Sequence, residues 1–168
     1  MSILFPEKPK PVVDANEFLF SAVGLAHGHI YGMTHALLNA GATLCEVWDD
    51  SPQKVAAFLK VFPQAKAAPS LEAALGNPAV HLIASAAVPS ERCALGIRAM
   101  RAGKDYFVDK APMTSLDQLA QARHAVAETG RKYMVYYSER LHSEAATAAD
   151  YLISEGKIGR VLHTDGFG

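Results

Sequence analysis

The order of apolar and amphipathic segments is the feature that most limits what this chain can fold into. From Glu17 onward, short apolar runs alternate with longer stretches whose apolar residues recur at helical spacing. Strands that alternate with helices are typical of βαβ units, in which the strands lie parallel and helices cover both faces of the sheet. The sequence therefore predicts an α/β fold with a doubly wound parallel sheet.

The expected elements are short and are bounded by residues that start or end them. The predicted strands are Leu19–Val23, Leu44–Trp48, Ala65–Ala67, Val80–Ala84, Asp105–Val108 and Lys132–Tyr136. The predicted helices are Ile30–Asn39, Pro52–Val61, Ser70–Leu75, Glu91–Arg101, Leu116–Thr129 and Ser143–Ser154. Glycines at positions 41, 103, 130 and 156 each follow a predicted helix, where glycine adopts a left-handed closing conformation at the least cost. Ser51 and Ser70 are expected to be helix N-caps.

Three parts of the chain differ in composition. Residues 1–16 contain Pro6, Pro9 and Pro11, and we expect an extended arm there because proline disfavours helices and central strands. Residues 17–141 are expected to form the α/β domain. Residues 142–168 are interpreted as a linking helix and the first strand, Arg160–Phe167, of a truncated second α/β domain.

Charge and composition argue against several functional classes. Lys plus Arg number 16 and Asp plus Glu 17, so the net charge is -1, whereas nucleic-acid binding needs a clustered basic excess. No apolar run approaches the roughly 20 residues that span a bilayer. Cys45 and Cys93 lack the close spacing of zinc or redox motifs. We expect a reduced cytoplasmic protein that binds neither nucleic acid nor a membrane.

A glycine-rich turn joins the first predicted strand to the first predicted helix. Gly24 and Ala26 are small, as a G-x-G-x-x-G pattern requires, but His29 stands in place of the third glycine. Small residues let the backbone approach a pyrophosphate, and the helix N-terminus favours its negative charge. The predicted dinucleotide contacts in this Rossmann-type turn are Gly24, Ala26, His27, Gly28, His29 and Ile30. The alternative is a glycine turn that binds no ligand.

The histidines of this turn have a spacing that metal ligands can use. His27 and His29 are two residues apart, and His35 is nearby. A zinc or iron site would also need a carboxylate or a third ligand placed with them, and the sequence provides none beside them. We therefore expect no metal, and we interpret His27 and His29 as hydrogen-bond donors to the pyrophosphate.

Two acidic residues end the second predicted strand, about 25 residues after Gly24. The carboxylate of Asp49 can accept hydrogen bonds from the adenosine ribose hydroxyls. Asp50 adds negative charge, we expect no arginine near it, and this charge would repel a 2′-phosphate. The expected cofactor is therefore NAD in preference to NADP. The alternative is that Asp49 and Asp50 only cap the helix that begins at Pro52.

A lysine follows the fifth predicted strand. Lys110 lies at the carboxyl end of Asp105–Val108, on the edge where doubly wound sheets bind ligands. A desolvated lysine beside an oxidised nicotinamide can accept the proton of a substrate hydroxyl while the hydride leaves, and Asp109 can orient it. The alternative is a solvated surface lysine.

With the glycine turn, Asp49 and the Asp109-Lys110 segment in this order, the sequence resembles the Gfo/Idh/MocA family, the relatives of glucose-fructose oxidoreductase and inositol dehydrogenase. The similarity covers about residues 18–168, and its most specific part is Arg98–Lys110. The resemblance implies NAD(P)-dependent oxidation of a hydroxyl on a sugar, polyol or related small molecule. It also implies a second domain that supplies a catalytic histidine, most substrate contacts and the interface of a homo-oligomer.

The resemblance also implies roles for individual residues. Lys110 matches the family's catalytic lysine, and Asp109 and Ala111 stand where the family has glutamate and proline. The segment from Ala86 to Arg92 matches a loop beside the cofactor's ribose and nicotinamide, with Arg92 in place of a histidine. The implied cofactor contacts here are Ala86, Ala87, Glu91, Asp109 and Lys110. The implied substrate side consists of Lys110, Tyr137 and Arg140.

Two other functions stay open at this point. A dinucleotide-binding sensor or regulatory module without turnover would account for the departures at Ala111 and Arg92. A fragment that completes its sheet with another chain would account for the unpaired strand expected at Arg160–Phe167.

Overall fold

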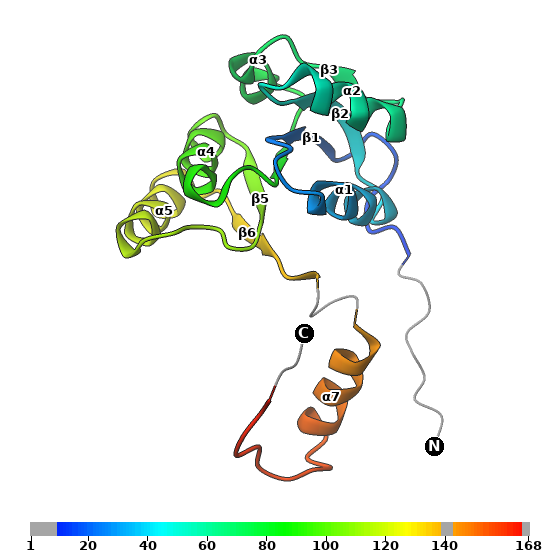
Figure 1. The fold of residues 1–168 in the computed structure, drawn as a ribbon, viewed down its shortest axis with the longest axis vertical. Helices are drawn as coiled ribbons and strands as arrows, with labels where there is room; N and C mark the ends of the chain where they lie inside the picture. Colours follow the sequence, from blue (N-terminus) through cyan, green and yellow to red (C-terminus); the bar gives the residue numbers. More distant parts are fainter. Residues whose placement is uncertain (1–9, 139–142, 166–168) are drawn as a thin grey trace. The chain divides into compact units, whose positions relative to one another are not determined.

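The computed structural model describes residues 10–138 and 143–165 (Figure 1). These residues belong to two compact units, of which the larger ends at Tyr136 and the smaller begins at Tyr137. The smaller unit contains helix α7 (Glu144–Ser154), and the Ser143 hydroxyl caps it by accepting a hydrogen bond from the Ala146 N–H. In the described ranges, no helix is both long and apolar enough to cross a bilayer.

The larger unit is built on a six-stranded sheet whose paired strands all run parallel, in the order β3-β2-β1-β4-β5-β6. Its strands are β1 (Leu19–Val23), β2 (Thr43–Trp48), β3 (Lys66–Ala67), β4 (Leu82–Ser85), β5 (Asp105–Asp109) and β6 (Tyr133–Tyr136). The connecting helices are α1 (His29–Asn39), α2 (Pro52–Val61), α3 (Leu71–Gly76), α4 (Pro89–Arg101) and α5 (Leu116–Thr129). The strand order reverses between β1 and β4, which is the doubly wound arrangement that the sequence predicts.

Helices α1 and α2 cover one face of the sheet. Successive residues of a strand point to opposite faces, and Phe20 and Ala22 of β1 point to this one. They pack against Ile30 and Met33 of α1 and Phe58 of α2, which are all fully buried. The buried side of α1 therefore starts immediately after the glycine turn and fixes the direction in which the chain leaves it.

Helices α3, α4 and α5 cover the other face. Val23 of β1 and Tyr106 of β5 belong to this second core, together with Leu75 of α3, Met100 of α4 and Ala125 of α5. Helices α4 and α5 pack side by side (Figure 1). The start of α4 is consequently held close to the carboxyl end of the sheet.

The glycine at position 96 sets how closely α4 approaches the sheet. A Cβ atom at Gly96 would lie 2.5 Å from Cδ1 of Tyr106 and 2.7 Å from Cε2 of Tyr133. The two tyrosine rings also contact each other, with 5.2 Å between their centroids. Because each ring is confined by the other, neither can move to make room for a side chain on α4.

The fold and the element order that the sequence predicts are confirmed. The expected and observed boundaries differ by at most two residues, as at Val80 against Leu82 for the start of β4. Ser51 and Ser70 cap α2 and α3 through their hydroxyl groups. The glycines at 41, 103, 130 and 156 have φ angles between +65° and +97°. Local signals therefore decide where these elements begin and end.

The strand expected at Arg160–Phe167 is wrong for the part that the structure describes, since residues 160–165 form no strand. A strand is stabilised when a neighbouring backbone pairs with its N–H and C=O groups, and no described strand pairs with this segment. The alternating side chains predicted an extended backbone but could not supply that neighbour. Phe167 lies outside the described residues.

Gly96→Ala is expected to lower the free energy of unfolding by about 1–3 kcal/mol, the usual cost of overpacking a core. Urea denaturation followed by the fluorescence of Trp48, the chain's one tryptophan, measures this change. Gly76→Ala is the matched control, because no atom lies within 4 Å of a Cβ built there. Equal losses of stability in the two variants would contradict the close packing at position 96.

Candidate functional site

The carboxyl ends of β1, β4 and β5 meet at one edge of the sheet. Gly24 follows β1, Ser85 ends β4 and Asp109 ends β5. The chain leaves β1 and β4 toward opposite faces, because α1 and α4 cover different faces. A crevice forms above such neighbouring strand ends, and this is where doubly wound sheets bind ligands.

The turn after β1 lies directly against the loop after β4. Gly24 has a φ of +76°, and a Cβ atom on it would lie 2.8 Å from Cβ of Ala87. The Ala86 N–H donates to the carbonyl oxygen of Gly24, and the His27 N–H donates to that of Ala86, each at 3.0 Å. Glycine is required at position 24 both by its backbone conformation and by this close approach.

Helix α1 begins as soon as the turn ends, with Gly28 at its N-cap. Its first amides already have acceptors, since the Ile30 and Tyr31 N–H groups donate to the carbonyl oxygens of His27 and Gly28 at 3.2 Å. The Ile30 side chain is fully buried in the core. The predicted contact at Ile30 therefore cannot come from its side chain, and what α1 offers an anion is the positive end of its dipole.

Asp49 stabilises the turn from the end of β2. Its Oδ2 accepts a hydrogen bond from the Leu25 N–H at 2.6 Å, and its Oδ1 accepts one from the Ser51 N–H at 2.9 Å. Lys54 Nζ lies 3.5 Å from Oδ1. Burial opposes ionisation, but these hydrogen bonds and the lysine outweigh it, so the pKa of Asp49 lies below its ordinary value. The cap of α2 is Ser51, which argues against the alternative that Asp49 only caps that helix.

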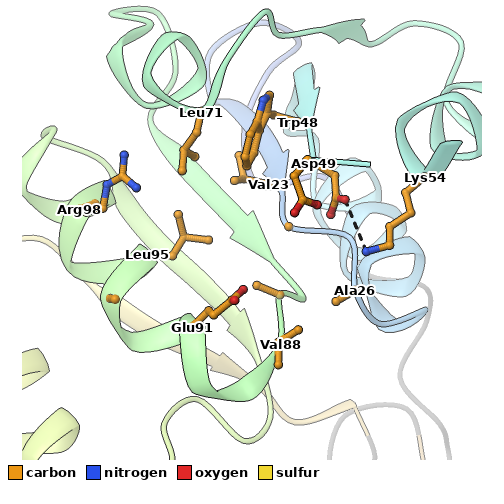
Figure 2. Close-up of a pocket in the computed structure, with 14 residues that line it drawn as sticks. Val23, Ala26, Trp48, Asp49, Lys54, Leu71, Val88, Glu91, Leu95 and Arg98 are labelled. Carbon is orange, nitrogen blue, oxygen red and sulfur yellow. Dashed lines mark ion pairs between the residues drawn. The ribbon is translucent and has the colours of Figure 1, made fainter. Parts of the chain in front are cut away.

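A hollow of about 400 Å³, here called the β2 hollow, opens beyond the end of β2. Figure 2 shows Trp48 of β2 and Leu95 of α4 on opposite sides of it. Gly24 and Ala26 of the turn also line it. Its charged lining residues are Asp49, Asp50, Lys54, Glu91 and Arg98.

The expectation that no arginine lies near Asp50 is wrong. Arg98 of α4 lines the same hollow, as does Lys54 of α2. Each of these cations has a carboxylate partner: Lys54 lies 3.5 Å from Asp49, and Arg98 lies 2.8 Å from Glu72. The sequence could not show this, because α4 reaches the hollow only after the sheet has formed.

A second hollow of about 280 Å³, here called the β5 hollow, lies at the end of β5. Ala26, Ala87 and Val88 line both hollows. These three residues form a neck of short apolar side chains between the two spaces. The polar side chains of the β5 hollow belong to His27, His29, Arg92, Asp109 and Lys110.

A buried arginine on α4 holds the β5 hollow together. The Arg92 side chain is 2% exposed. Its Nε donates to the carbonyl oxygen of Ala87 at 2.6 Å. One terminal nitrogen donates to the carbonyl oxygens of Asp109 and Lys110 at 3.0 and 2.5 Å, and the other lies 3.1 Å from Oδ2 of Asp109. The sequence located Arg92 only as a substitute for a family histidine, whereas the structure makes it the link between two loops.

Asp109 brings a carboxylate to the two histidines of the turn. Nδ1 of His29 lies 2.9 Å from Oδ1, and Nδ1 of His27 lies 3.6 Å from Oδ2. The reason given for expecting no metal, the lack of a third ligand, is therefore wrong, because β5 supplies one. Two contacts nevertheless oppose a cation: Arg92 is paired with Asp109, and Nδ1 of His27 accepts a hydrogen bond from the His29 N–H at 3.2 Å. The absence of a metal stays a prediction.

Lys110 lines the β5 hollow and is half-buried. It directly follows Asp109, and its peptide bond to Ala111 is cis. The position of Lys110 at the carboxyl end of β5 agrees with the sequence prediction. Its partial burial distinguishes it from a fully solvated surface lysine.

The remaining predicted residues lie in different places. Ala86 is fully buried and offers only its backbone, and His35 packs against Phe62 with 4.9 Å between ring centroids. Tyr137 belongs to the smaller unit, and Arg140 lies outside the described residues. The residues of the β2 hollow that sequence reasoning missed include Trp48, Lys54 and Arg98. Of these, Arg98 stands seven residues after Glu91 and so on the same helix face, which is a signal that could have found it.

A parallel sheet with a close-packed glycine turn and hollows on both sides of it defines a dinucleotide-binding α/β domain. The chain belongs to the Gfo/Idh/MocA oxidoreductase family, because residues 20–137 match the model of that family, described as an oxidoreductase family with an NAD-binding Rossmann fold. The resemblance found in the sequence is thus confirmed. No curated protein matches the chain.

Solved structures of similar proteins agree with this fold. A candidate oxidoreductase from Erwinia carotovora atroseptica SCRI1043 is 42% identical with a TM-score of 0.83, over 86% of this chain and 43% of that one. A candidate NADPH-dependent oxidoreductase from Desulfitobacterium hafniense DCB-2 is 23% identical with a TM-score of 0.76, over 86% and 41% of the two chains. Apo scyllo-inositol dehydrogenase from Lactobacillus casei is 17% identical with a TM-score of 0.71, over 88% and 44%. The chain thus spans less than half the length of these structures.

Asp49→Asn is expected to lower the free energy of unfolding at neutral pH by about 1–3 kcal/mol, because one amide oxygen cannot replace two carboxylate oxygens that each accept a backbone N–H. The pKa of Asp49 is lower in the folded protein than in the unfolded chain. Its stabilisation is therefore present above the unfolded pKa of about 4 and is lost as the pH falls through the folded pKa.

Urea denaturation of both proteins at neutral pH and at about pH 3 measures this dependence. The difference in stability between wild type and Asp49→Asn should shrink at the lower pH. Asp14→Asn, an exposed change on the segment before β1, is the control and should leave stability nearly unchanged. A difference for Asp49→Asn that does not depend on pH would contradict the assignment.

Proposed function

We propose that this chain binds a nicotinamide dinucleotide across the two hollows and forms the cofactor-binding part of an oxidoreductase that acts on a hydroxyl of a sugar, polyol or related small molecule. The observation that carries this proposal is that the two hollows are neighbours, since Ala26, Ala87 and Val88 line both of them. An extended dinucleotide needs two pockets joined at its pyrophosphate, and the neck lies beside the turn at the start of α1. The adenosine half would occupy the β2 hollow and the nicotinamide half the β5 hollow.

The residues of the β2 hollow fit an adenosine. Trp48 and Leu71 offer apolar surface to a base, and Asp49 stands where ribose hydroxyls would donate to it. Both Asp49 oxygens already accept backbone N–H groups, but a carboxylate has about four acceptor positions. Asp49 can therefore hold the turn and the ribose at the same time.

The charges of the β2 hollow support NAD over NADP. Asp49 and Asp50 would repel a 2′-phosphate, and the nearby cations Lys54 and Arg98 are already paired with Asp49 and Glu72. The Desulfitobacterium hafniense protein is named for NADPH, but its likeness to this chain supports the fold alone. We therefore propose NAD as the cofactor of this chain.

The residues of the β5 hollow fit the transfer of a proton during oxidation. The nicotinamide, when bound in its oxidised form, would accept a hydride. Lys110, in its neutral form, would accept the proton of the substrate hydroxyl. Arg92 would keep Lys110 in place by binding its carbonyl oxygen. Ala87 and Asp109 would border the nicotinamide and its ribose.

The substrate side is proposed from relatives and from the sequence. A scyllo-inositol dehydrogenase shares this fold, and inositols are polyols with the secondary hydroxyl that the proposal needs. Tyr137 and Arg140 would contact the substrate, together with residues of the length that the relatives have and this chain does not span. Assembly into a homo-oligomer is part of the same proposal.

Titration with NADH and NADPH tests the cofactor proposal. NADH should bind at least about tenfold more tightly, a difference of about 1.4 kcal/mol, because the acidic pair disfavours the 2′-phosphate. Quenching of the Trp48 fluorescence measures both affinities. An Asp50→Asn variant should narrow the preference. Equal affinities for the two nucleotides would contradict NAD selectivity, and no binding of either would contradict the proposed function.

Lys110→Ala tests the chemical role of the lysine. Hydride transfer from a panel of inositols and sugar alcohols to NAD should fall by about 10²- to 10⁴-fold, the usual contribution of a general base, while NADH affinity should change little. Absorbance of NADH measures the rate. Lys60→Ala, an exposed lysine of α2, is the matched control. A wild type that binds NADH but turns over no member of the panel would favour the sensor or regulatory module.

A further inference from the structure

His29 and Asp109 form a hydrogen-bonded pair between two distant parts of the sequence. His29 is the first residue of α1 and Asp109 the last of β5, and Nδ1 of the histidine lies 2.9 Å from Oδ1 of the aspartate. The Asp109 side chain is 2% exposed, whereas that of His29 is 33% exposed. A buried carboxylate thus holds a histidine that is partly open to solvent.

The surroundings of Asp109 decide which nitrogen of His29 carries the proton. Oδ2 of Asp109 lies 3.1 Å from the Arg92 guanidinium, which only donates hydrogen bonds. A carboxylate paired in this way accepts on both oxygens, so Nδ1 of His29 must be the donor toward Oδ1. In a neutral ring Nε2 is then unprotonated and able to accept a proton.

His27 differs from His29 although the two rings are in edge contact, with 4.2 Å between centroids. Nδ1 of His27 accepts a hydrogen bond from the His29 N–H at 3.2 Å. In a neutral His27 the proton therefore lies on Nε2, the opposite arrangement. The tautomer of His27 can therefore serve as a reference for that of His29 within the same protein.

The groups that face His29 come from four parts of the fold. They are Asp109 and Lys110 at the end of β5, Arg92 of α4 behind Asp109, His27 of the turn, and Tyr136 of β6 at 6.3 Å between ring centroids. Asp109 is the anion among them and is the group that touches Nδ1. His29 and Lys110 line the same hollow of about 280 Å³, which places two nitrogen bases in one small space.

Building on the proposed function, we propose that His29 is a second proton-transfer residue of the β5 hollow, which passes the proton taken up by Lys110 to solvent. During oxidation the substrate O–H bond breaks and its proton goes to the neutral amine of Lys110. The electron pair of the neighbouring C–H bond leaves with the hydride to the oxidised nicotinamide, and a carbonyl forms. Lys110 is then an ammonium and must lose its proton before the next turnover. Nε2 of His29 accepts that proton, directly or through one water, and releases it on its exposed side.

Nitrogen-15 NMR of the histidine rings tests the arrangement on which the relay depends. Above the ordinary histidine pKa of about 6.5, the His29 ring should carry its proton on Nδ1 and the His27 ring on Nε2. Spectra of His29→Gln and His27→Gln assign the signals. A proton on Nε2 of His29 in the wild type would overturn the proposal.

Asp109→Asn gives the second arm of the NMR test. Arg92 donates only, so the amide oxygen of Asn should stay with Arg92 and the amide NH₂ group should turn toward His29. The His29 proton should then move from Nδ1 to Nε2, as expected when a carboxylate that fixes a tautomer becomes an amide. An unchanged tautomer in this variant would overturn the assignment.

Chemical rescue separates a proton relay from a structural role. His29→Ala should lower kcat for the oxidation of an inositol by about 10²-fold, and imidazole in the buffer should restore part of the rate. His124→Ala, which changes an exposed histidine of α5 that lines neither hollow, is the matched control and should show neither effect. If wild type binds no NADH or oxidises no polyol, the proposed function fails. If wild type is active but His29→Ala is equally active, or is slow without rescue, only the relay fails.

Discussion

The hydrogen bonds of one buried guanidinium hold the candidate site together. Each of the three Arg92 nitrogens faces an oxygen atom of the loop after β4 or of the end of β5. A charge is tolerated in a protein interior only when it is paired and hydrogen-bonded. Here Asp109 supplies the opposite charge and backbone carbonyls accept the other N–H groups. Together with the pairing of β4 and β5, this single side chain therefore holds Ala87 at the neck close to Lys110 in the β5 hollow.

The fold could be predicted because its signals are local. Apolar runs, serine caps and closing glycines lie within or next to the elements that they define, and a parallel sheet requires little else to be recognised. The strand expected from Arg160 onward shows the limit of such signals, because side-chain alternation favours an extended backbone but pairing depends on a neighbour. Strands β1 to β6 have such neighbours, and residues 160–165 have none among the described strands.

From the sequence, the only parts of the candidate site that could be predicted were the residues that directly follow a strand. Gly24, Asp49 and Lys110 each follow a strand directly, so the sequence located them. Motif position does not fix side-chain direction: the Ile30 side chain points into the core, so the cofactor contact predicted at Ile30 would have to come from its backbone. Contacts between distant segments could not be predicted either. The clearest example is the hydrogen bond between His29 and Asp109, which are 80 residues apart in the sequence.

The neck lies between the β2 hollow and the β5 hollow, so the domain has two neighbouring sites that can each be considered separately. The walls of the neck are formed by Ala26, Ala87 and Val88, which offer neither charge nor hydrogen-bonding side chains, so each half of a dinucleotide would be recognised on its own side. Two small compounds, one shaped for each hollow, should therefore be able to occupy the domain together. Joining them through the neck would make the second binding step intramolecular, with an effective concentration in the millimolar range for a short linker. If the proposed binding mode holds, the same geometry provides a route to selective inhibitors assembled from fragments.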